Sequence, residues 1–497
     1  MNEIKMPTAH TLLLLIAAAV ALLTWYVPAG KYDSLQYDKT AKVFIQKNLK
    51  ESITHPATQE TLEKLQVKIP LEKFTGGAIW KPINIPNTYA TVTAAPQGLI
   101  AYIKSPIKGI IEGADIIFLV LIIGGLIGIM NITGAFEAGI AALAAQLKGR
   151  EYLLIITVTI AIAIGGTTFG LAEETIAFYP ILIPVFLAAR YDAIVALASI
   201  YIGSSIGTMC STVNPFSTII ASDAAGINWT TGLEARILFL LISTTVCILY
   251  ILWYAKRVKK DPKNSIIYAQ KEEIEALFGA TTETEHKLTF RLRLILILFV
   301  LCFVVMIYGV AKLEWWFLEM TSVFLVGAVL IGIIGRIKEV TFVDTFIKGA
   351  SELLGVALII GIARGISVLM NDGMISDTLL YYAGEFTEGM PKVIFANVLV
   401  AVYGGLSFFI PSSSGMAVLT MPIIAPLADT VAMGREIVVN CYVYGMGLFA
   451  FINPTGLILA SLAIVKIGYD KWLKFVLPLV GILTLMVIAM ISASLYF

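Results

Sequence analysis

The sequence predicts an all-α membrane protein built from two inverted repeats, with about nine transmembrane helices, two re-entrant hairpins and two broken helices. Of its 497 residues, 58% are hydrophobic and only 14% are charged, whereas the charged share of soluble proteins is nearer a quarter. Apolar runs of roughly 20 residues, the length of a helix that crosses a bilayer, recur along most of the chain. Four short motifs also recur at one fixed distance, which indicates duplicated halves.

Composition excludes several classes of function. With a net charge of +1 and no basic run inside a folded polar domain, we expect no nucleic acid partner. The four cysteines are scattered through apolar segments, so they form neither a disulfide framework nor a metal cluster. The three histidines have no nucleophile paired with them, so an enzyme is not expected. The expected partners are the lipid bilayer and a small-molecule substrate, with no cofactor beyond a coupling sodium ion or proton.

Charge sets the predicted topology. A first transmembrane helix at 1–27 is followed by a polar insert and an interfacial helix at 28–113, with strand-like pieces such as "KVFIQK". The linker at 255–292 is dense in Lys and Arg, so the positive-inside rule places it in the cytoplasm. The amino terminus then lies inside and the insert lies outside. The insert could act as a lid, as a partner surface or as a dimer contact.

The other predicted segments follow in order. A first inverted repeat spans 114–254, two scaffold helices and an interfacial segment span 293–351, and a second inverted repeat spans 352–497. The carboxyl terminus is expected outside. The crossings are placed near 9–27, 114–133, 193–225, 233–253, 293–311, 318–336, 352–370, 433–463 and 472–496.

Four pairs of motifs identify the repeats, at an offset of about 240 residues. They are "IGIMNITGAF" with "ISVLMNDGMI", "YPILIP" with "MPIIAP", "STVNPF" with "FINPTG", and Gly165-Gly166 with Gly404-Gly405. Lys148, Arg150 and Arg190 flank the first glycine pair and should all be cytoplasmic, so the chain enters and leaves the bilayer there on one side. The glycines are expected to open the turn of this inner re-entrant hairpin. The matching segment, from "VIFANVLVAVYGG" to "MPIIAPLA", becomes an outer hairpin, so the repeats are antiparallel.

Each repeat also carries a broken helix. "CSTVNPFST" and "FINPTGL" interrupt apolar spans with proline, which removes an amide donor and frees carbonyl groups that are costly to expose to lipid. Two hairpin tips and two broken helices should therefore meet at one central site near the midplane. Freed carbonyls and side-chain oxygens suit an alkali cation, and helix amino ends attract a carboxylate. The oxygen donors are Ser211, Thr212, Asn214 and Ser217, with Asn453, Thr455, Ser412, Ser413 and Ser414 in the second repeat.

Charged residues inside the apolar segments are candidates for function. Glu173 and Glu174 lie in the inner hairpin, where an ionised carboxylate costs at least about 2.5 kcal/mol. They could hold a coupling cation, bind a substrate ammonium or guanidinium group, or carry a proton; alternatively, one of them is tied to backbone amides and shapes the tip. Arg364 lies near the middle of its span, and either binds a substrate carboxylate or pairs with a glutamate of the inner hairpin. Asp223, Asp372 and Asp377 are expected to be solvated charges near span ends.

The run from "EETIAFYPILIPVF" to "GTMCSTVNPFSTIIAS" resembles the YfcC/DcuC-type carriers, the anaerobic four-carbon dicarboxylate carrier family of the ion transporter superfamily. The resemblance extends from "PQGLIAYIKSPIKGIIEGAD" to "NPTGLILASLAIVKIGYDKW". It implies secondary active transport by an elevator-like movement of the hairpin domain, in a homodimer in the bacterial inner membrane. In superfamily relatives, Ser-Asn-Thr motifs at both hairpin tips bind substrate carboxylate and sodium. The matching positions here are Glu173-Glu174-Thr175 and Ser412-Ser413-Ser414.

The acidic first tip bears on the substrate. Two fixed anions would repel a dianionic dicarboxylate unless they were protonated or neutralised by cations. The family also includes carriers that look like arginine/ornithine exchangers, so the sequence favours such an amino acid. A four-carbon dicarboxylate, coupled to sodium or protons, is the alternative, and a channel is the rival from a different class. The substrate set is Thr168, Glu173, Glu174, Thr175, Asn214, Arg364, Ser412, Ser413, Ser414, Asn453 and Thr455, and the cation set is Thr175, Ser211, Thr212, Asn214, Ser217, Ser413 and Asn453.

Overall fold

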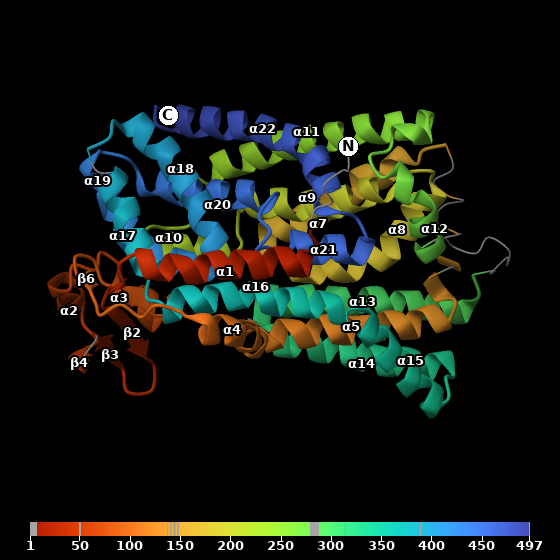
Figure 1. The fold of residues 1–497 in the computed structure, drawn as a ribbon, viewed down its shortest axis with the longest axis horizontal. Helices are drawn as coiled ribbons and strands as arrows, with labels where there is room; N and C mark the ends of the chain where they lie inside the picture. The colour runs from red at the N-terminus through yellow and green to blue at the C-terminus, as the bar shows by residue number, and fades with distance from the viewer. Residues whose placement is uncertain are drawn as a thin grey trace.

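The computed structural model describes residues 7–48, 51–136, 138–139, 142, 146, 149–278, 288–313, 315–387 and 389–496 (Figure 1). Most helices run along the long axis of the molecule. The insert lies at one end and the linker helix α12, Lys271–Phe278, lies at the other. The carboxyl terminus lies at the end that carries the insert. The predicted flanking charge Lys148 and part of the predicted linker lie outside the described residues.

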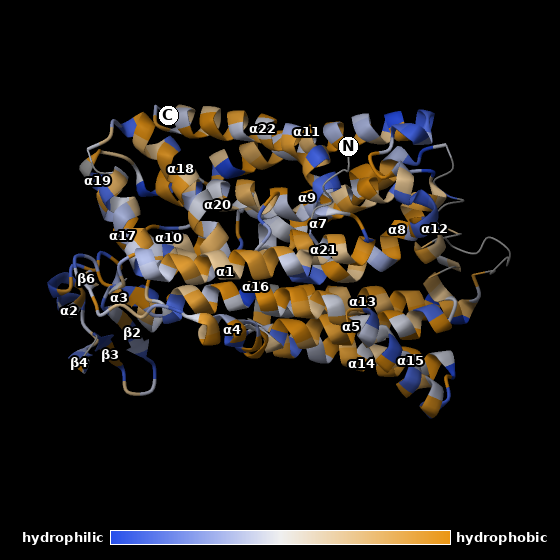
Figure 2. Cartoon of the chain, viewed as in Figure 1, coloured by the Kyte–Doolittle hydropathy of each residue, from blue (hydrophilic) through white to orange (hydrophobic). Residues whose placement is uncertain are grey.

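Hydropathy follows the same long axis. Figure 2 shows hydrophobic residues along the middle of most helices and hydrophilic residues gathered toward the two ends. Within the described ranges, nine helices are long and apolar enough to cross a bilayer, so the chain is a multi-pass integral membrane protein. Their bounds are α1 Ala9–Tyr26, α5 Ala114–Ile132, α7 Tyr152–Phe169, α11 Leu233–Lys260, α13 Phe290–Leu313, α14 Phe317–Gly335, α16 Leu354–Asp372, α18 Lys392–Phe409 and α22 Tyr469–Ser494.

These nine helices are not the same set as the predicted crossings. The hairpin arms α7 and α18 meet the length and hydropathy criteria, whereas the two broken helices do not, because each is divided at a proline into shorter pieces. The first broken helix consists of α9, η2 and α10, and the second of α20 and α21, so both predicted breaks are present. Their bounds are α9 Ala193–Met209, η2 Pro215–Ile219, α10 Ile220–Ala224, α20 Arg435–Ala450 and α21 Ile458–Val465.

Two helical hairpins extend in opposite directions. The inner hairpin runs through α7, η1 (Glu173–Phe178) and α8 (Tyr179–Ala188), and the outer hairpin runs through α18 and α19 (Ser413–Thr430). Figure 1 shows α8 toward the linker end and α18 with α19 toward the insert end. This opposed arrangement is that of inverted repeats. The re-entrant path of the hairpins through a bilayer stays a prediction.

The predicted position of the hairpin turns is wrong. Gly165 and Gly166 lie inside α7, which continues to Gly170, where a positive φ of 77° suits glycine. A Cβ at Gly166 would lie 2.8 Å from the carbonyl oxygen of Ser204, so this glycine lets α7 pack closely on α9. In the outer hairpin, α18 likewise continues past Gly404 before its own turn. Gly166 and Gly404, one glycine of each pair, therefore lie against a neighbouring helix, and the turns come later.

Equivalent helices of the two repeats begin 240 residues apart. α4 (Leu99–Glu112) leads into α5 and α15 (Glu339–Glu352) leads into α16, and each pair of starting residues differs by 240, as do those of α7 and α18. α1 packs on α16 as α14 packs on α5, so α1 and α14 are also equivalent. Only the first repeat carries the insert, between α1 and α4, because α14 leads almost directly into α15. The duplication inferred from the motifs is confirmed at the level of whole helices.

Each repeat contains a close crossing of two helices at glycines. A Cβ at Gly109 of α4 would lie 2.1 Å from the carbonyl oxygen of Gly361 in α16. In the other repeat, a Cβ at Gly349 of α15 would lie 2.3 Å from the carbonyl oxygen of Gly124 in α5. Such backbone contact is typical of membrane helices that associate through small residues. The crossings hold α4 against α16 and α15 against α5. The predicted interfacial position of α4 and α15 stays a prediction.

The insert, residues 27–98, has a small core of its own. Its four-stranded antiparallel sheet has the order β4-β3-β2-β5, and β1 pairs with β6. Leu35, Phe44 and Phe74 are almost fully buried in this core. The bounds are β1 Gly30–Lys31, β2 Ser34–Asp38, β3 Val43–Lys47, β4 Ser52–Pro56, α2 Gln59–Lys64, α3 Leu71–Thr75, β5 Ile83–Asn84 and β6 Ala90–Thr91. Three short helices complete the described elements: η3 Pro262–Asn264, η4 Tyr268–Gln270 and α17 Ser376–Thr387.

Candidate functional site

One cavity of about 450 Å³ lies where the two hairpin tips approach the two broken helices. This volume is within the range of small-molecule sites in proteins. Residues of α5, α9 and α16 line it together with both tips and both breaks. Trp316, which precedes α14, and Lys81 of the insert line it as well. The structure thus brings both tips and both breaks to one cavity, as the sequence predicts.

The tip of the inner hairpin places two glutamates at the cavity. Glu174 is 9% exposed, and its Oε2 accepts a hydrogen bond of 3.2 Å from the backbone amide of Ala172. Glu173 also lines the cavity and, among the described residues, has no hydrogen bond or ion pair. One glutamate is therefore tied to the tip backbone, and the other is free to meet a ligand.

The tip of the outer hairpin is a helix start lined by serines. The side chain of Ser412 caps α19 by accepting a 3.2 Å hydrogen bond from the amide of Gly415. The Tyr442 hydroxyl donates to the backbone carbonyl of Ser413, which ties the tip to α20. The Ser414 hydroxyl accepts a hydrogen bond from the insert. All three serines line the cavity, so the amino end of α19 is available to an anion there.

Both asparagines of the breaks line the cavity, yet they also hold the fold. The side-chain oxygen of Asn214 accepts from the amide of Phe216, and that of Asn453 accepts from the amide of Thr455. Each amino group donates to a backbone carbonyl of the hairpin arm in its own repeat. Much of the hydrogen-bonding capacity of both asparagines is therefore used inside the protein.

Four residues of the predicted sets do not line the cavity, and the hydroxyl groups of all four bond to nearby protein atoms. Thr168 and Thr175 donate to carbonyl groups of their own segment. Ser211 is bonded to the Ser217 hydroxyl, and Thr212 to Thr167. The predicted residues that do line it are Glu173, Glu174, Asn214, Ser217, Arg364, Ser412, Ser413, Ser414, Asn453 and Thr455.

Sequence reasoning missed several lining residues. Ser204 and Thr208 lie four residues apart on the apolar helix α9. This spacing places both hydroxyl groups on one face of the helix, so it could have indicated a polar cavity beside that face. Glu112 and Asp115 lie at the junction of α4 and α5, where charges at helix ends are ordinarily solvated. Lys81 had no sequence signal, because its position depends on how the insert packs.

Within the part of the chain that the structure describes, two cations line the cavity without an acidic partner. Among the described residues, the Arg364 side chain has no hydrogen bond or ion pair, so the alternative of a bridge to an inner-hairpin glutamate is not present. Ser367, one turn further along α16, donates to the carbonyl of Phe409 at the end of α18, which places this part of α16 beside the outer hairpin. Lys81 Nζ donates a 2.7 Å hydrogen bond to Ser414 Oγ. Burial and the nearby Arg364 charge lower the pKa of Lys81.

Two aspartates fasten the insert to the helices. Asp223 has a side chain that is only 3% exposed and forms an ion pair of 2.7 Å with Lys73. Asp377 accepts hydrogen bonds from the amide of Tyr32 and the side chain of Asn84. The prediction of solvated charges is wrong for Asp223, because the insert covers the helix end on which it lies, and Asp377 is half-buried under the insert. The prediction is confirmed for Asp372, whose side chain is exposed and pairs with Lys108.

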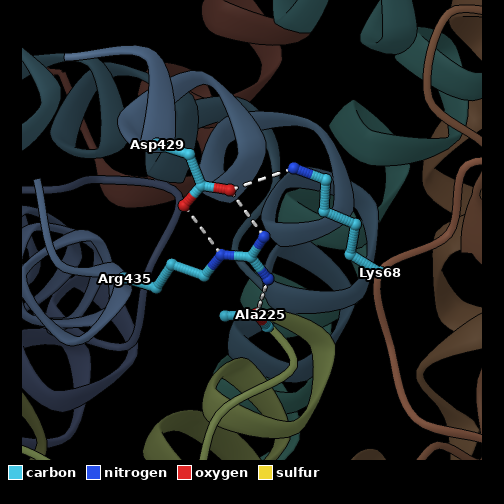
Figure 3. A network of polar contacts seen from close by, with 4 residues as sticks. All are labelled: Lys68, Ala225, Asp429 and Arg435. Carbon is cyan, nitrogen blue, oxygen red and sulfur yellow. Dashed lines mark hydrogen bonds and ion pairs between the residues drawn. The ribbon is translucent and has the colours of Figure 1, made fainter. Parts of the chain in front are cut away.

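A third attachment of the insert is visible in Figure 3. Asp429, near the end of α19, accepts from Lys68 of the insert at 3.1 Å and from two nitrogens of Arg435 at 3.0 and 2.7 Å. Arg435, the first residue of α20, also donates to the carbonyl of Ala225 at the end of α10. The insert, the outer hairpin and both broken helices are thus joined at one point.

One family model matches almost the whole chain, and two curated proteins are similar to it over nearly their full length. The model described as "DcuC: C4-dicarboxylate anaerobic carrier" matches residues 6–496. An uncharacterized protein of Haemophilus influenzae is 43% identical over 495 residues, 99% of this chain and 97% of that protein. The Escherichia coli protein named "Putative basic amino acid antiporter YfcC" is 30% identical over 508 residues, 97% of this chain and 94% of that protein. The crystal structure of the Alcanivorax borkumensis YdaH transporter is similar with a TM-score of 0.41 and 13% identity, over 98% of each chain.

Proposed function

Because the chain belongs to the C4-dicarboxylate anaerobic carrier (DcuC) family and is a membrane transporter, we propose that it is a secondary active carrier of a basic amino acid such as arginine or ornithine. The substrate binds in the cavity between the two hairpin tips. Transport consists of an elevator-like movement of the hairpins and broken helices past the remaining helices.

The charges that line the cavity carry this proposal. They are four carboxylates against two cations, a formal charge of −2, which attracts a cationic substrate and repels a dianionic one. Arginine and ornithine each carry one carboxylate and two cationic groups, so they suit a cavity that holds both signs of charge. The charged lining residues are Lys81, Glu112, Asp115, Glu173, Glu174 and Arg364.

The two ends of the cavity bind different groups of such a substrate. Glu173 binds the cationic side chain, because its carboxylate lines the cavity and has no partner among the residues that the structure describes, while that of Glu174 is already bonded to the tip. The amino end of α19 and Arg364 bind the α-carboxylate, since a helix start and a guanidinium both stabilise an anion. The name of the Escherichia coli relative supports the same class of substrate.

A four-carbon dicarboxylate is the second candidate. The description of the family favours it, and so does the pair of cations, Lys81 and Arg364, near the outer tip. It requires that the cavity carboxylates be protonated or bound to cations when the dianion enters. Asn214, Ser217, Ser413 and Asn453 are the members of the predicted sodium set that line the cavity and are the candidate ligands in that case.

The inverted repeats support a carrier over a channel. Two antiparallel copies can exchange their conformations, which exposes one central site to either side in turn. We place the protein in the bacterial inner membrane as a homodimer, with the insert outside. Coupling to sodium, to protons or to exchange of a second substrate all fit the cavity.

Uptake into liposomes that contain the purified protein tests the proposal. Radiolabelled arginine, ornithine, succinate and fumarate are offered while the sodium gradient, the pH gradient and the internal unlabelled substrate are varied one at a time. We expect saturable arginine uptake that internal ornithine accelerates. Succinate uptake without arginine uptake would reject the amino acid in favour of the dicarboxylate. A flux that does not saturate and shows no countertransport would reject the carrier.

A further inference from the structure

We propose that the insert supplies a residue of the substrate site: Lys81, together with Arg364, binds the carboxylate group of the substrate. This inference rests on the proposed function, because it requires a substrate that carries a carboxylate. It gives the insert a role in recognition in addition to its attachments to the helix ends.

Aromatic contacts hold Lys81 at the cavity. Trp80 contacts Trp316 with ring centroids 6.0 Å apart, and Trp316 contacts Phe216 of the first break at 4.9 Å. Trp316 and Phe216 both line the cavity. Lys81 Nζ lies 4.6 Å from the centroid of the Trp80 ring and 2.7 Å from Ser414 Oγ. The ammonium group is thus fixed between an aromatic ring and the tip of the outer hairpin.

Lys81 differs from the lysines that attach the insert. Lys68 and Lys73 each form an ion pair with an aspartate, whereas Lys81 forms none among the described residues although it is partly buried. An ammonium group has three hydrogens to donate, and Ser414 accepts one of them. A partly buried cation without a counter-charge is unfavourable, so an anion that enters the cavity is stabilised there. Arg364 lines the same cavity and, in the described ranges, also lacks an acidic partner.

The positive charge at the outer hairpin tip has no counterpart at the equivalent positions of the first repeat. Ser414 follows Glu174 by 240 residues, and Arg364 follows Gly124 by the same number. Where the first repeat presents a carboxylate, the second presents a hydroxyl group bonded to Lys81, from an insert that only the first repeat carries. Two related hairpin tips therefore become an acidic end and a basic end. A substrate with one carboxylate is oriented with that group toward the outer tip.

Arginine and agmatine, its decarboxylated counterpart, test this assignment directly. Affinities for both are measured on the full-length wild-type protein and on Lys81→Gln, by ligand-dependent thermal shift in detergent and by uptake into liposomes. We expect Lys81→Gln to weaken arginine binding about tenfold and to leave agmatine binding unchanged. Lys81→Arg keeps the charge and should keep most of the arginine affinity. Lys47→Gln, at the exposed end of β3, is the matched control.

Restoring the charge chemically separates recognition from folding. The four native cysteines are buried, so Lys81→Cys can be modified selectively. Attachment of 2-aminoethyl methanethiosulfonate should restore arginine affinity, and attachment of the negatively charged 2-sulfonatoethyl reagent should not. Equal losses for arginine and agmatine, no loss for arginine, or no difference between the two reagents would overturn the proposal.

The outcome also separates this inference from the proposed function. If the wild-type protein carries neither arginine nor ornithine, the proposed function fails whatever Lys81 does. If it carries succinate instead, Lys81→Gln must weaken succinate, because the inferred contact is to a carboxylate group. Unchanged succinate affinity in that variant would overturn the role of Lys81.

Discussion

Asn214 and Asn453 make the same pair of hydrogen bonds in the two repeats. The side-chain oxygen of each accepts the backbone amide two residues further on, at 2.8 and 3.1 Å. The amino groups donate to the carbonyls of Gly166 in α7 and Ser407 in α18, at 3.4 and 3.0 Å. Each asparagine therefore makes one hydrogen bond within its own break and one to the adjacent hairpin arm. In each repeat, these bonds join the broken helix and the hairpin into one unit.

We predict that Asn453→Ala lowers the free energy of unfolding by about 2 kcal/mol, because it leaves a buried amide and a buried carbonyl without partners. The thermal midpoint of the purified protein in detergent measures this loss, and substrate uptake should fall with it. Asn131→Ala, at an exposed position near the end of α5, is the control and should change neither quantity. A midpoint for Asn453→Ala equal to that of the control would contradict the tie between break and hairpin.

A second prediction concerns Glu173. Because its carboxylate lines the cavity with no partner in the described part of the protein, Glu173→Gln should weaken arginine binding about tenfold relative to citrulline, whose side chain is neutral. Competition of the two compounds for labelled ornithine uptake measures the ratio. Glu51→Gln, an exposed residue of the insert, is the control. An unchanged ratio of arginine to citrulline would remove Glu173 from the cation-binding end.

A third prediction concerns the crossing of α4 and α16. Gly109→Ala places a methyl group 2.1 Å from the carbonyl oxygen of Gly361, so the helices must separate. We expect a loss of about 1 to 3 kcal/mol in stability, the usual cost of overpacking. Gly355→Ala is the matched control on α16, because its Cβ meets open space and alanine favours the helix. A thermal midpoint of Gly109→Ala at or above that of Gly355→Ala would contradict the close crossing.

A fourth prediction concerns the attachment of the insert. Asp223→Asn breaks a largely buried ion pair and leaves Lys73 without its counter-charge, which costs about 2 kcal/mol. The insert should then be cleaved faster by a protease in limited digestion. Lys64→Ala removes an exposed pair with Glu60, in which both side chains are more than 70% exposed, and should not change the cleavage rate. Equal rates for the two variants would show that the Lys73 contact does not hold the insert.

A site residue can be predicted from the sequence when its own chemistry determines its role. It cannot be predicted when the role depends on which residues pack against it in the folded protein. The breaks at Asn214 and Asn453 are predictable because proline follows each and cannot continue a helix. Glu173 is predictable as a cavity residue because a charge in an apolar segment needs a polar surrounding. Gly166 does not open the predicted turn, because glycine also permits close helix packing, and only the partner helix α9 distinguishes the two roles. Lys81 could not be predicted as a cavity residue, because only the tertiary contacts of the insert bring it to the cavity.

An experimental structure of the protein in lipid nanodiscs with saturating arginine tests the central claim most directly. The account predicts both hairpin tips and both breaks around a single bound arginine. The side chain of that arginine should lie at Glu173, and its carboxylate should lie within about 3 Å of Arg364 or Lys81. Hairpin tips that lie apart from one another, or an arginine bound outside the cavity, would contradict it.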